Sequence, residues 1–110
     1  MTTKSLFSAQ AEILKAVAQP VRLAIVDCLK DEERCVCEIV AEVGAGRCNV
    51  SRHLALMHRA GVLASRKEGL KVYYRLQCPC VADFLRCTTG VLRDKVRRTQ
   101  RLLASPAGSR

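Results

Sequence analysis

Strand-like alternation of apolar residues occurs in only one region of this sequence, between Gly61 and Pro79. Before Gly61, apolar residues recur at three- and four-residue intervals, which predicts helices. The predicted helices cover residues 6–17, 20–29, 36–43 and 47–59, with a charged loop at residues 30–34. The alternating pattern instead predicts two strands, at residues 62–66 and 72–76. The glycine in the segment between them is typical of a β-hairpin. A last helix runs from Pro79 to about residue 103, so the fold class is mainly α with a small β-hairpin.

The order of these elements constrains the fold further, because a short helix, a glycine-containing turn and a longer helix form a helix-turn-helix. The turn is the Gly-Ala-Gly segment at residues 44–46. The hairpin follows the longer helix directly and would form a wing, while the long apolar stripe on the last helix suggests a partner chain. We therefore predict a winged helix-turn-helix domain over residues 1–103 and a flexible tail over residues 104–110.

Composition indicates a polyanionic partner. The 110 residues include 19 basic and 10 acidic side chains, giving a net charge of +9, which favours nucleic acid over a membrane surface. Aromatic residues make up only 4%, which argues against the stacking platforms of single-strand binders. No apolar run approaches the ~20 residues that cross a bilayer, and the first residues lack the apolar region of a signal peptide. We expect a cytoplasmic protein that binds double-stranded DNA and no membrane.

The second helix of a helix-turn-helix lies in the major groove. Arginine there suits guanine and asparagine suits adenine, whereas basic residues of the wing would contact phosphates and fix the register. The predicted groove-facing residues are Arg47, Asn49, Ser51, Arg52 and His53, and the predicted phosphate contacts are Arg66, Lys67 and Lys71. A histidine such as His53 could equally lie on the helix surface without a role in binding.

Four segments of the sequence resemble the ArsR/SmtB family of metal-responsive repressors, in the order in which that family has them. They are LKAVAQPVRLAI at residues 14–25, CVCEI at 35–39, NVSRHL at 49–54, and the wing from EG at 68–69 to YYRL at 73–76. The resemblance is closest to the arsenic- and antimony-responsive members. It implies a homodimer joined through the first and last helices, and a repressor that leaves its operator DNA when its ligand binds.

Cys35 and Cys37 match the metal-binding box of that family. Residues two apart on a helix point ~200° away from each other, whereas alternate residues of an extended segment share a face. Both thiolates could therefore hold one ion only where the helix start is extended or distorted, and chelation would then displace the recognition helix that this helix supports. Thiolates prefer soft ions, so the expected inducer is As(III) or Sb(III), with Cd(II), Pb(II) or Zn(II) as alternatives. Related repressors often carry a third cysteine where this chain has Val40, so a third ligand must come from elsewhere or from a small thiol.

Cys78, Cys80 and Cys87 form a second candidate metal cluster. The first two flank a proline where an extended segment enters a helix, which lets both thiols face one way. Cys87 lies seven residues beyond Cys80, or ~10.5 Å along one helix, so it would contribute across a dimer or simply pack. Cys28 is expected to be a buried small hydrophobe, and Cys48 to lie against the turn or near DNA.

Two alternative roles for the thiols stay open at this point. The first keeps the repressor but uses its thiols as a redox or persulfide switch instead of a metal site. The second is a cysteine-based thiol enzyme. The sequence lacks a thioredoxin-like Cys-x-x-Cys on an alternating α/β pattern, contains only two histidines and has no glycine-rich phosphate loop, so we predict that the protein is not an enzyme.

Overall fold

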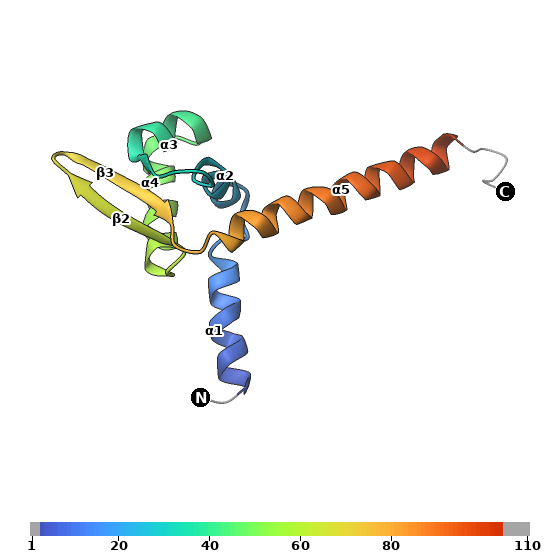
Figure 1. Cartoon of the computed structure of the whole chain (residues 1–110), viewed down its shortest axis with the longest axis horizontal. Helices are drawn as coiled ribbons and strands as arrows, with labels where there is room; N and C mark the ends of the chain where they lie inside the picture. Colours follow the sequence, from blue (N-terminus) through green and yellow to red (C-terminus); the bar gives the residue numbers. More distant parts are fainter. Residues whose placement is uncertain (1–2, 105–110) are drawn as a thin grey trace.

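A computed structural model describes residues 3–104, within which five helices and three short strands are found (Figure 1). In chain order these are α1 (Thr3–Lys15), α2 (Pro20–Cys28), β1 (Arg34–Cys35), α3 (Val36–Val43), α4 (Arg47–Arg59), β2 (Leu63–Glu68), β3 (Lys71–Leu76) and α5 (Cys80–Ala104). The predicted fold class is confirmed. Of the predicted tail, Ala104 is the last residue of α5 and residues 105–110 lie outside the described part of the chain.

Local chemistry sets the helix boundaries around the helix-turn-helix. Pro20 begins α2, where its missing N–H removes no helical hydrogen bond. The side-chain Oε1 of Gln19 caps this helix by accepting a hydrogen bond from the backbone N–H of Arg22 at 3.1 Å. At the end of α3, Gly44 has a φ of 72°, a left-handed conformation that glycine adopts without strain. The chain can therefore turn directly from α3 into α4.

The sheet contains one strand more than the sequence predicted. Its order is β1-β3-β2 and both pairings are antiparallel. Strands β2 and β3 form the predicted hairpin, while β1 lies on the other side of β3, with Arg34 opposite Tyr74 and Cys35 opposite Tyr73. The sequence predicted a loop up to Arg34, because a strand of two residues is too short to show alternation. Since β1 leads directly into α3, its pairing with β3 joins the wing to the helix-turn-helix.

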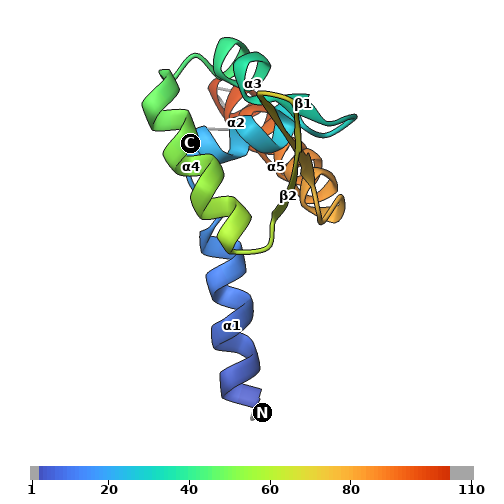
Figure 2. The same cartoon turned by 90° about the vertical axis from the view of Figure 1, so that its left-hand side faces the viewer.

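The core lies between α2, α3, α4 and the start of the wing (Figure 2). Its most deeply buried side chains, each less than 2% exposed, are Ile25, Val26, Ile39, Val50, Leu54, Met57 and Val62. The three from α4 recur at intervals of four and three residues, so they lie on one face of this helix. Their burial fixes the rotation of α4 about its axis, and so decides which residues its outer face presents.

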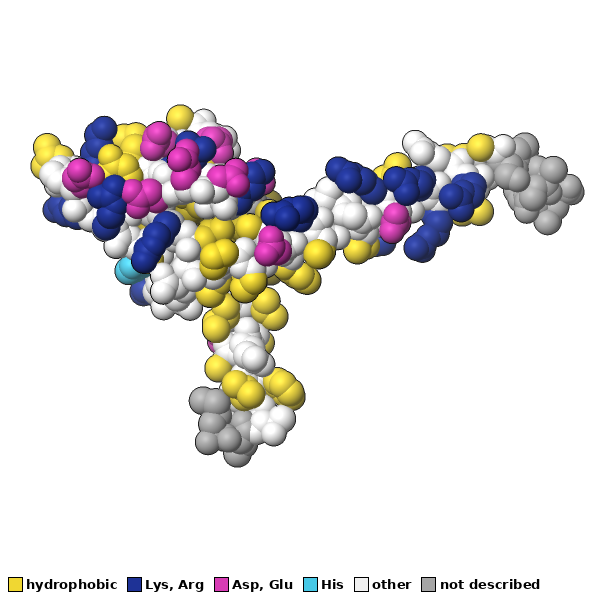
Figure 3. All heavy atoms as spheres, viewed as in Figure 1, with side chains coloured by type: hydrophobic (Ala, Val, Ile, Leu, Met, Phe, Trp, Pro, Cys, Tyr) yellow, Lys and Arg dark blue, Asp and Glu magenta, His cyan; other side chains and the backbone are white. Residues whose placement is uncertain are grey.

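Helices α1 and α5 extend away from this body (Figure 1). The radius of gyration is 18.3 Å, compared with about 13 Å for a compact chain of this length. Apolar side chains between 43% and 78% exposed line both helices (Figure 3): Leu6, Phe7, Ile13, Leu14, Phe84, Val91, Leu92, Val96, Leu102 and Leu103. None of the helices within residues 3–104 has the length and hydropathy needed to span a membrane. A single copy thus leaves much apolar helix surface uncovered.

The first prediction concerns the core. Ile39 of α3 is fully buried and packs in the same cluster as the inward face of α4. Ile39→Ala removes three carbons from this close-packed site and should lower the free energy of unfolding by about 2–5 kcal/mol. Leu70→Ala is the matched control, because Leu70 is 99% exposed and its loss should change stability by less than about 0.5 kcal/mol. Urea denaturation at equal protein concentrations measures both, and equal effects of the two substitutions would contradict the core described above.

Candidate DNA-binding interface and thiol site

The outer face of α4 presents most of the predicted groove-facing residues. Arg47, Ser51 and Arg52 are exposed, and Asn49 is half-buried. Arg52 Nη2 donates a hydrogen bond to Asn49 Oδ1 at 3.2 Å, so these two side chains are already held beside each other. An arginine and an asparagine arranged in this way on the first turns of a recognition helix can address guanine and adenine edges together.

His53 has a different position from the other four residues. Its Nδ1 accepts a hydrogen bond from Nε of Arg22 on α2 at 3.1 Å, in a partly buried setting. Burial, followed by the charges of Arg22 and Arg52, lowers the pKa of His53, and the ring must be neutral to accept at Nδ1. Arg22 also donates from Nη1 to the carbonyl of Lys15 at the end of α1. His53 thus contributes to a hydrogen bond that connects α4 with α2.

The wing carries Lys67 and Lys71 as exposed cations near its tip. The tip is a two-residue turn whose first residue, Gly69, has a φ of 62°. Tight hairpin turns need a positive φ at this position, which glycine adopts readily. Neither lysine forms a salt bridge within residues 3–104. Both therefore remain available to phosphate.

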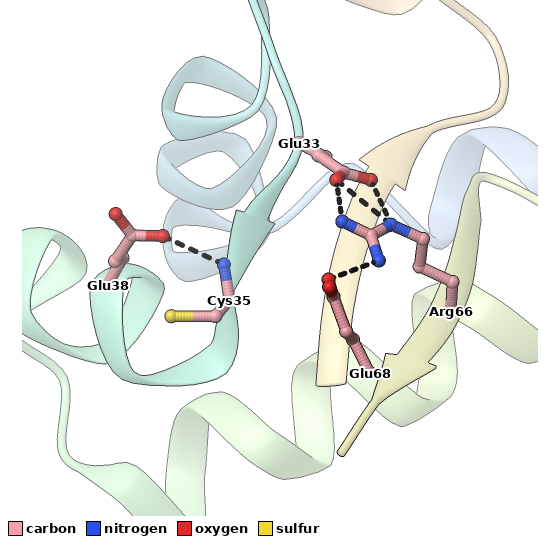
Figure 4. A network of polar contacts seen from close by, with 5 residues as sticks. All are labelled: Glu33, Cys35, Glu38, Arg66 and Glu68. Atoms are coloured by element: carbon pink, nitrogen blue, oxygen red, sulfur yellow. Dashed lines mark hydrogen bonds and ion pairs between the residues drawn. The ribbon is translucent and has the colours of Figure 1, made fainter. Parts of the chain in front are cut away.

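Arg66, the third predicted phosphate contact, is held by two carboxylates (Figure 4). Its Nε donates to both carboxylate oxygens of Glu33 at 3.0 Å, and its Nη1 donates to Glu68 Oε2 at 2.8 Å. Its guanidinium also lies 4.4 Å from the centre of the Tyr73 ring. The two carboxylates raise the pKa of Arg66, and the hydrogen bond and charge of Arg66 in turn lower the pKa of Glu33. Arg66 is therefore less suited to phosphate than the neighbouring lysines, and it ties the wing to the loop before β1.

Sequence reasoning missed both acidic partners of Arg66. The alternation of strand residues places Glu68 on the same face of β2 as Arg66, so that contact could have been found. Glu33 lies 33 residues away in sequence, and only the pairing of β1 with β3 brings it beside the wing. No local pattern signals this second contact.

Cys35 and Cys37 lie where the wing meets the helix-turn-helix. Cys35 has extended backbone, with φ −78° and ψ 159°, and precedes the first residue of α3. The extended start that a two-thiol site would require at this helix is thus present. The Cys35 thiol is buried, at 7% exposure, whereas Cys37 is exposed in the first turn of α3.

Glu38 holds the extended conformation of Cys35 in place (Figure 4). The backbone N–H of Cys35 donates to Glu38 Oε1 at 3.0 Å. Hydrogen bonds from the backbone and thiol of Cys35 lower the pKa of Glu38, and the charges of Arg34 and Lys71 lower it further. A carboxylate in the first turn of a helix also interacts favourably with the helix dipole. The geometry of the thiol pair is therefore tied to the start of α3.

A pocket of about 140 Å³ connects the thiol pair with the predicted DNA-binding surface. Cys35 and Cys37 line it together with Arg47 of α4 and Lys71 of the wing. Arg47 Nη1 lies 3.9 Å from Cys37 Sγ, within the distance of a weak hydrogen bond to sulfur. One small volume thus contains both predicted metal ligands, one predicted base contact and one predicted phosphate contact.

The thiols fit a soft ion, but one copy of the chain offers only part of a ligand set here. Two adjacent thiols are suitable donors for a thiophilic metal or metalloid. Within residues 3–104, no three His, Cys, Asp or Glu side chains come together closely enough to hold an ion. Of the second cluster, Cys78 is half-buried, while Cys80 and Cys87 are exposed on α5. A complete three-donor site therefore needs a ligand from outside the single chain.

Cys28 is buried in the core, as predicted, and lies outside both clusters. It is 4% exposed. Burial and the neighbouring Glu42 carboxylate raise the pKa of its thiol to about 12. Such a thiol stays protonated at neutral pH and is a poor nucleophile and ligand.

Comparison with known proteins places these features in a family. Residues 19–65 match the model of the bacterial regulatory proteins of the arsR family. The chain is 33% identical over 93 residues to an uncharacterized HTH-type transcriptional regulator of Mycobacterium tuberculosis, Rv0081, covering 84% of this chain and 82% of that protein. The crystal structure of that regulator has a TM-score of 0.72 at 32% identity, covering 86% of this chain and 95% of the other.

Two further similarities concern function and assembly. The arsenical resistance operon repressor of Escherichia coli is 39% identical over 66 residues, which cover 59% of this chain and 56% of that protein. The solution structure of the homodimeric winged helix-turn-helix DNA-binding domain Mb0332 from Mycobacterium bovis has a TM-score of 0.74 at 27% identity, covering 89% of this chain and 93% of that one. The relatives with a stated role are transcriptional regulators and not enzymes, and the winged helix-turn-helix prediction is confirmed.

The second prediction concerns thiol reactivity. Cys37 and Cys48 are exposed, whereas Cys28 is buried with a raised pKa. Alkylation of the native protein by iodoacetamide at pH 8 should therefore be at least about tenfold slower at Cys28 than at either exposed thiol. Peptide mass spectrometry at timed intervals measures the three rates, and the same reaction in concentrated guanidinium, where they should converge, is the control. Alkylation of native Cys28 at the rate of Cys37 would show that the thiol is not buried as described.

Proposed function

This chain belongs to the ArsR family of bacterial regulatory proteins, and we propose that it is a homodimeric repressor that releases operator DNA when Cys35 and Cys37 bind a trivalent metalloid. Members of the ArsR/SmtB family are DNA-binding transcriptional repressors, and that coarser function applies to this chain. The observation that carries the finer proposal is the shared pocket, in which both thiols and Arg47 are lining residues. A ligand on the thiols would change the position of a residue that reads DNA.

In the proposed complex, α4 lies in the major groove and the wing follows the backbone. Arg47, Asn49, Ser51 and Arg52 would contact base edges. Lys67 and Lys71 would contact phosphates. Arg66 and His53 would act indirectly, because their contacts with Glu33 and Arg22 hold the wing and α4 in position.

A second copy of the chain would cover the apolar faces of α1 and α5. An apolar pocket of about 300 Å³ lies where the end of α1, α2 and the start of α5 meet, and Leu14, Leu23 and Phe84 line it. Insertion of apolar side chains from a partner into this pocket would bury area that a single copy leaves in water. A two-fold dimer would then present two recognition helices to half-sites about one helical turn apart.

The proposed inducers are As(III) and Sb(III), ions that prefer polarizable sulfur donors. The similarity to the arsenical resistance operon repressor of Escherichia coli supports this choice over Cd(II), Pb(II) or Zn(II). Bonding to both sulfurs requires Cys35 to leave its buried position beside Glu38. That movement would loosen the first turn of α3, which packs against α4 through Ile39.

The third prediction tests the sensor. A double-stranded operator, selected from a random-sequence library, is labelled for fluorescence anisotropy. Arsenite should weaken its binding to the protein by at least about tenfold, and Cys35→Ser/Cys37→Ser should abolish this response while binding without arsenite persists. The matched control is Cys78→Ser/Cys80→Ser, which makes the same chemical change in the second cluster and should respond like the natural chain. A response that survives loss of Cys35 and Cys37 would contradict the proposed sensor, and a response lost only in the control would assign it to Cys78 and Cys80.

The fourth prediction tests the dimer. Phe84 is 65% exposed and lines the apolar pocket, so Phe84→Asp would place a charge in the proposed interface and should weaken dimerisation by about 100-fold or more. Leu70→Asp makes a comparable change at the tip of the wing and should leave the dimer intact. Sedimentation equilibrium over a range of concentrations measures both dissociation constants. A natural chain that sediments as a monomer at every concentration would contradict the proposed assembly.

A further inference from the structure

We propose that the metalloid held by Cys35 and Cys37 takes its third ligand from a small-molecule thiol that carries a carboxylate, and that Arg47 and Lys71 bind this carboxylate. The proposal rests on the proposed function and specifies the ligand of the same site. It makes the inducer a ternary adduct of protein, metalloid and an anionic thiol. Four observations support it: the shortage of protein donors, the size of the pocket, the cations that line it and the balance of the reaction.

The first observation is that the chain does not complete the site. Trivalent arsenic forms three bonds, and only two thiols line the pocket. One turn further along α3 the residue is Val40, which has no donor atom. Cys48 follows Arg47 directly in α4 but does not line the pocket, and within residues 3–104 no set of three donors comes together. Within one copy of the chain, the third position on arsenic is thus open to a sulfur from solution.

The second observation is the space beside the two thiols. The pocket of about 140 Å³ corresponds to the liquid volume of about five water molecules at ~30 Å³ each. That is more than a single ion needs and enough for a short carbon chain with a thiol and a carboxylate. Val36 and Val72 contribute apolar wall, against which methylene groups can pack.

The third observation is the charge of the pocket. Arg47 and Lys71 line it from two sides, and neither is engaged in a salt bridge within the described residues. Of the acidic groups close to these cations, Glu38 accepts from the N–H of Cys35, and Glu68, which lies opposite Lys71 in the hairpin, accepts from Arg66. Two cations next to two thiols are not required to bind neutral arsenious acid. They suit a ligand that brings a negative charge together with a sulfur atom.

The reaction needs no oxidant or reductant. Arsenious acid carries three hydroxyl groups, and each is replaced by a sulfur. The thiols of Cys35, Cys37 and the small molecule each form one As–S bond, and each thiol proton leaves with one hydroxyl as water. Three As–O bonds break, three As–S bonds form, and arsenic stays trivalent.

The adduct would also explain how metalloid binding weakens the affinity for DNA. Arg47 and Lys71 are the residues proposed to contact a base and a phosphate. A carboxylate that pairs with both would compete with DNA for the same two cations. Release would then follow from direct competition for charge as well as from loosening of α3.

The experiment uses the full chain with arsenite and one of three short thiols: 3-mercaptopropionate, 2-mercaptoethanol or 2-aminoethanethiol. These differ mainly in charge, which is negative, neutral and positive. Intact mass spectrometry under native conditions counts the arsenic and small thiol bound per chain. Arsenite affinity is measured from the ultraviolet absorption of the As–S bonds in the natural chain, in Arg47→Gln/Lys71→Gln and in Arg52→Gln/Lys67→Gln. The last variant is the matched control, because it removes the same two charges from α4 and from the wing at positions that do not line the pocket.

We expect a chain that carries one arsenic and one small thiol. Because the three thiols differ in their own affinity for arsenic, the informative quantity is the affinity of the natural chain divided by that of the variant. For Arg47→Gln/Lys71→Gln this ratio should be about 10 with 3-mercaptopropionate, about 1 with 2-mercaptoethanol and below 1 with 2-aminoethanethiol. For the control variant it should be about 1 with all three thiols.

Three results would overturn the proposal. Arsenic bound without a small thiol, even in excess thiol, would show that a protein donor completes the site. Equal ratios for the three thiols would show that Arg47 and Lys71 do not distinguish the charge of the small thiol. Either of these two results would leave the proposed repressor function unchanged. No arsenite bound at Cys35 and Cys37 would overturn the proposed inducer together with this inference.

Discussion

The pairing of β1 with β3 is the contact on which the arrangement of the functional parts depends. It involves only Arg34 and Cys35, opposite Tyr74 and Tyr73. Yet it determines that the wing, the start of α3 and both candidate sensor thiols meet at one place. Without it, the hairpin would be an isolated two-stranded ribbon, which is marginally stable in water. The same residue, Cys35, ends this strand and precedes α3, so a change at its thiol acts on a strand and a helix at once.

Basic residues in this protein have two distinct tasks. Arg66 and Arg22 are bound to Glu33 and His53, respectively, and so connect elements far apart in sequence. Arg22 also reaches the carbonyl of Lys15, so the end of α1 and the recognition helix are linked through one side chain. The net charge of +9 therefore overstates the cations that DNA would meet on the reading face. The location of a basic residue in the fold, and not its charge alone, decides its role. Some are suited to contact DNA, and others hold the wing and α4 in position.

The sequence was sufficient to predict the elements with strong local signals. Helices α3 and α4 begin and end as predicted, because apolar periodicity and the glycine turn between them act over a few residues. The extended backbone at Cys35, which the sequence argument made a condition for a two-thiol site, is also present. Strand β1 could not be predicted, because two residues carry no alternation and their strand character comes from pairing with β3. The positions of Arg66 and His53 depend on Glu33 and Arg22, 33 and 31 residues away, and no local pattern encodes such contacts.

In the proposed sensing reaction, the unequal burial of the two thiols implies an order of events. Cys37 is exposed and borders Arg47, whereas Cys35 is 7% exposed and lies beside Glu38. A ligand from solution therefore meets Cys37 first, and bonding at that sulfur alone leaves the first turn of α3 intact. The second bond requires Cys35 to move, which opposes the hydrogen bond from its N–H to Glu38 and the pairing of β1 with the wing. Only a ligand that forms both bonds can supply the free energy for this movement, since a ligand shifts a conformational equilibrium by no more than its difference in affinity for the two states. A chelating ion meets that requirement and a reagent that modifies one thiol does not, so the buried position of Cys35 would make the proposed response selective for chelating ions.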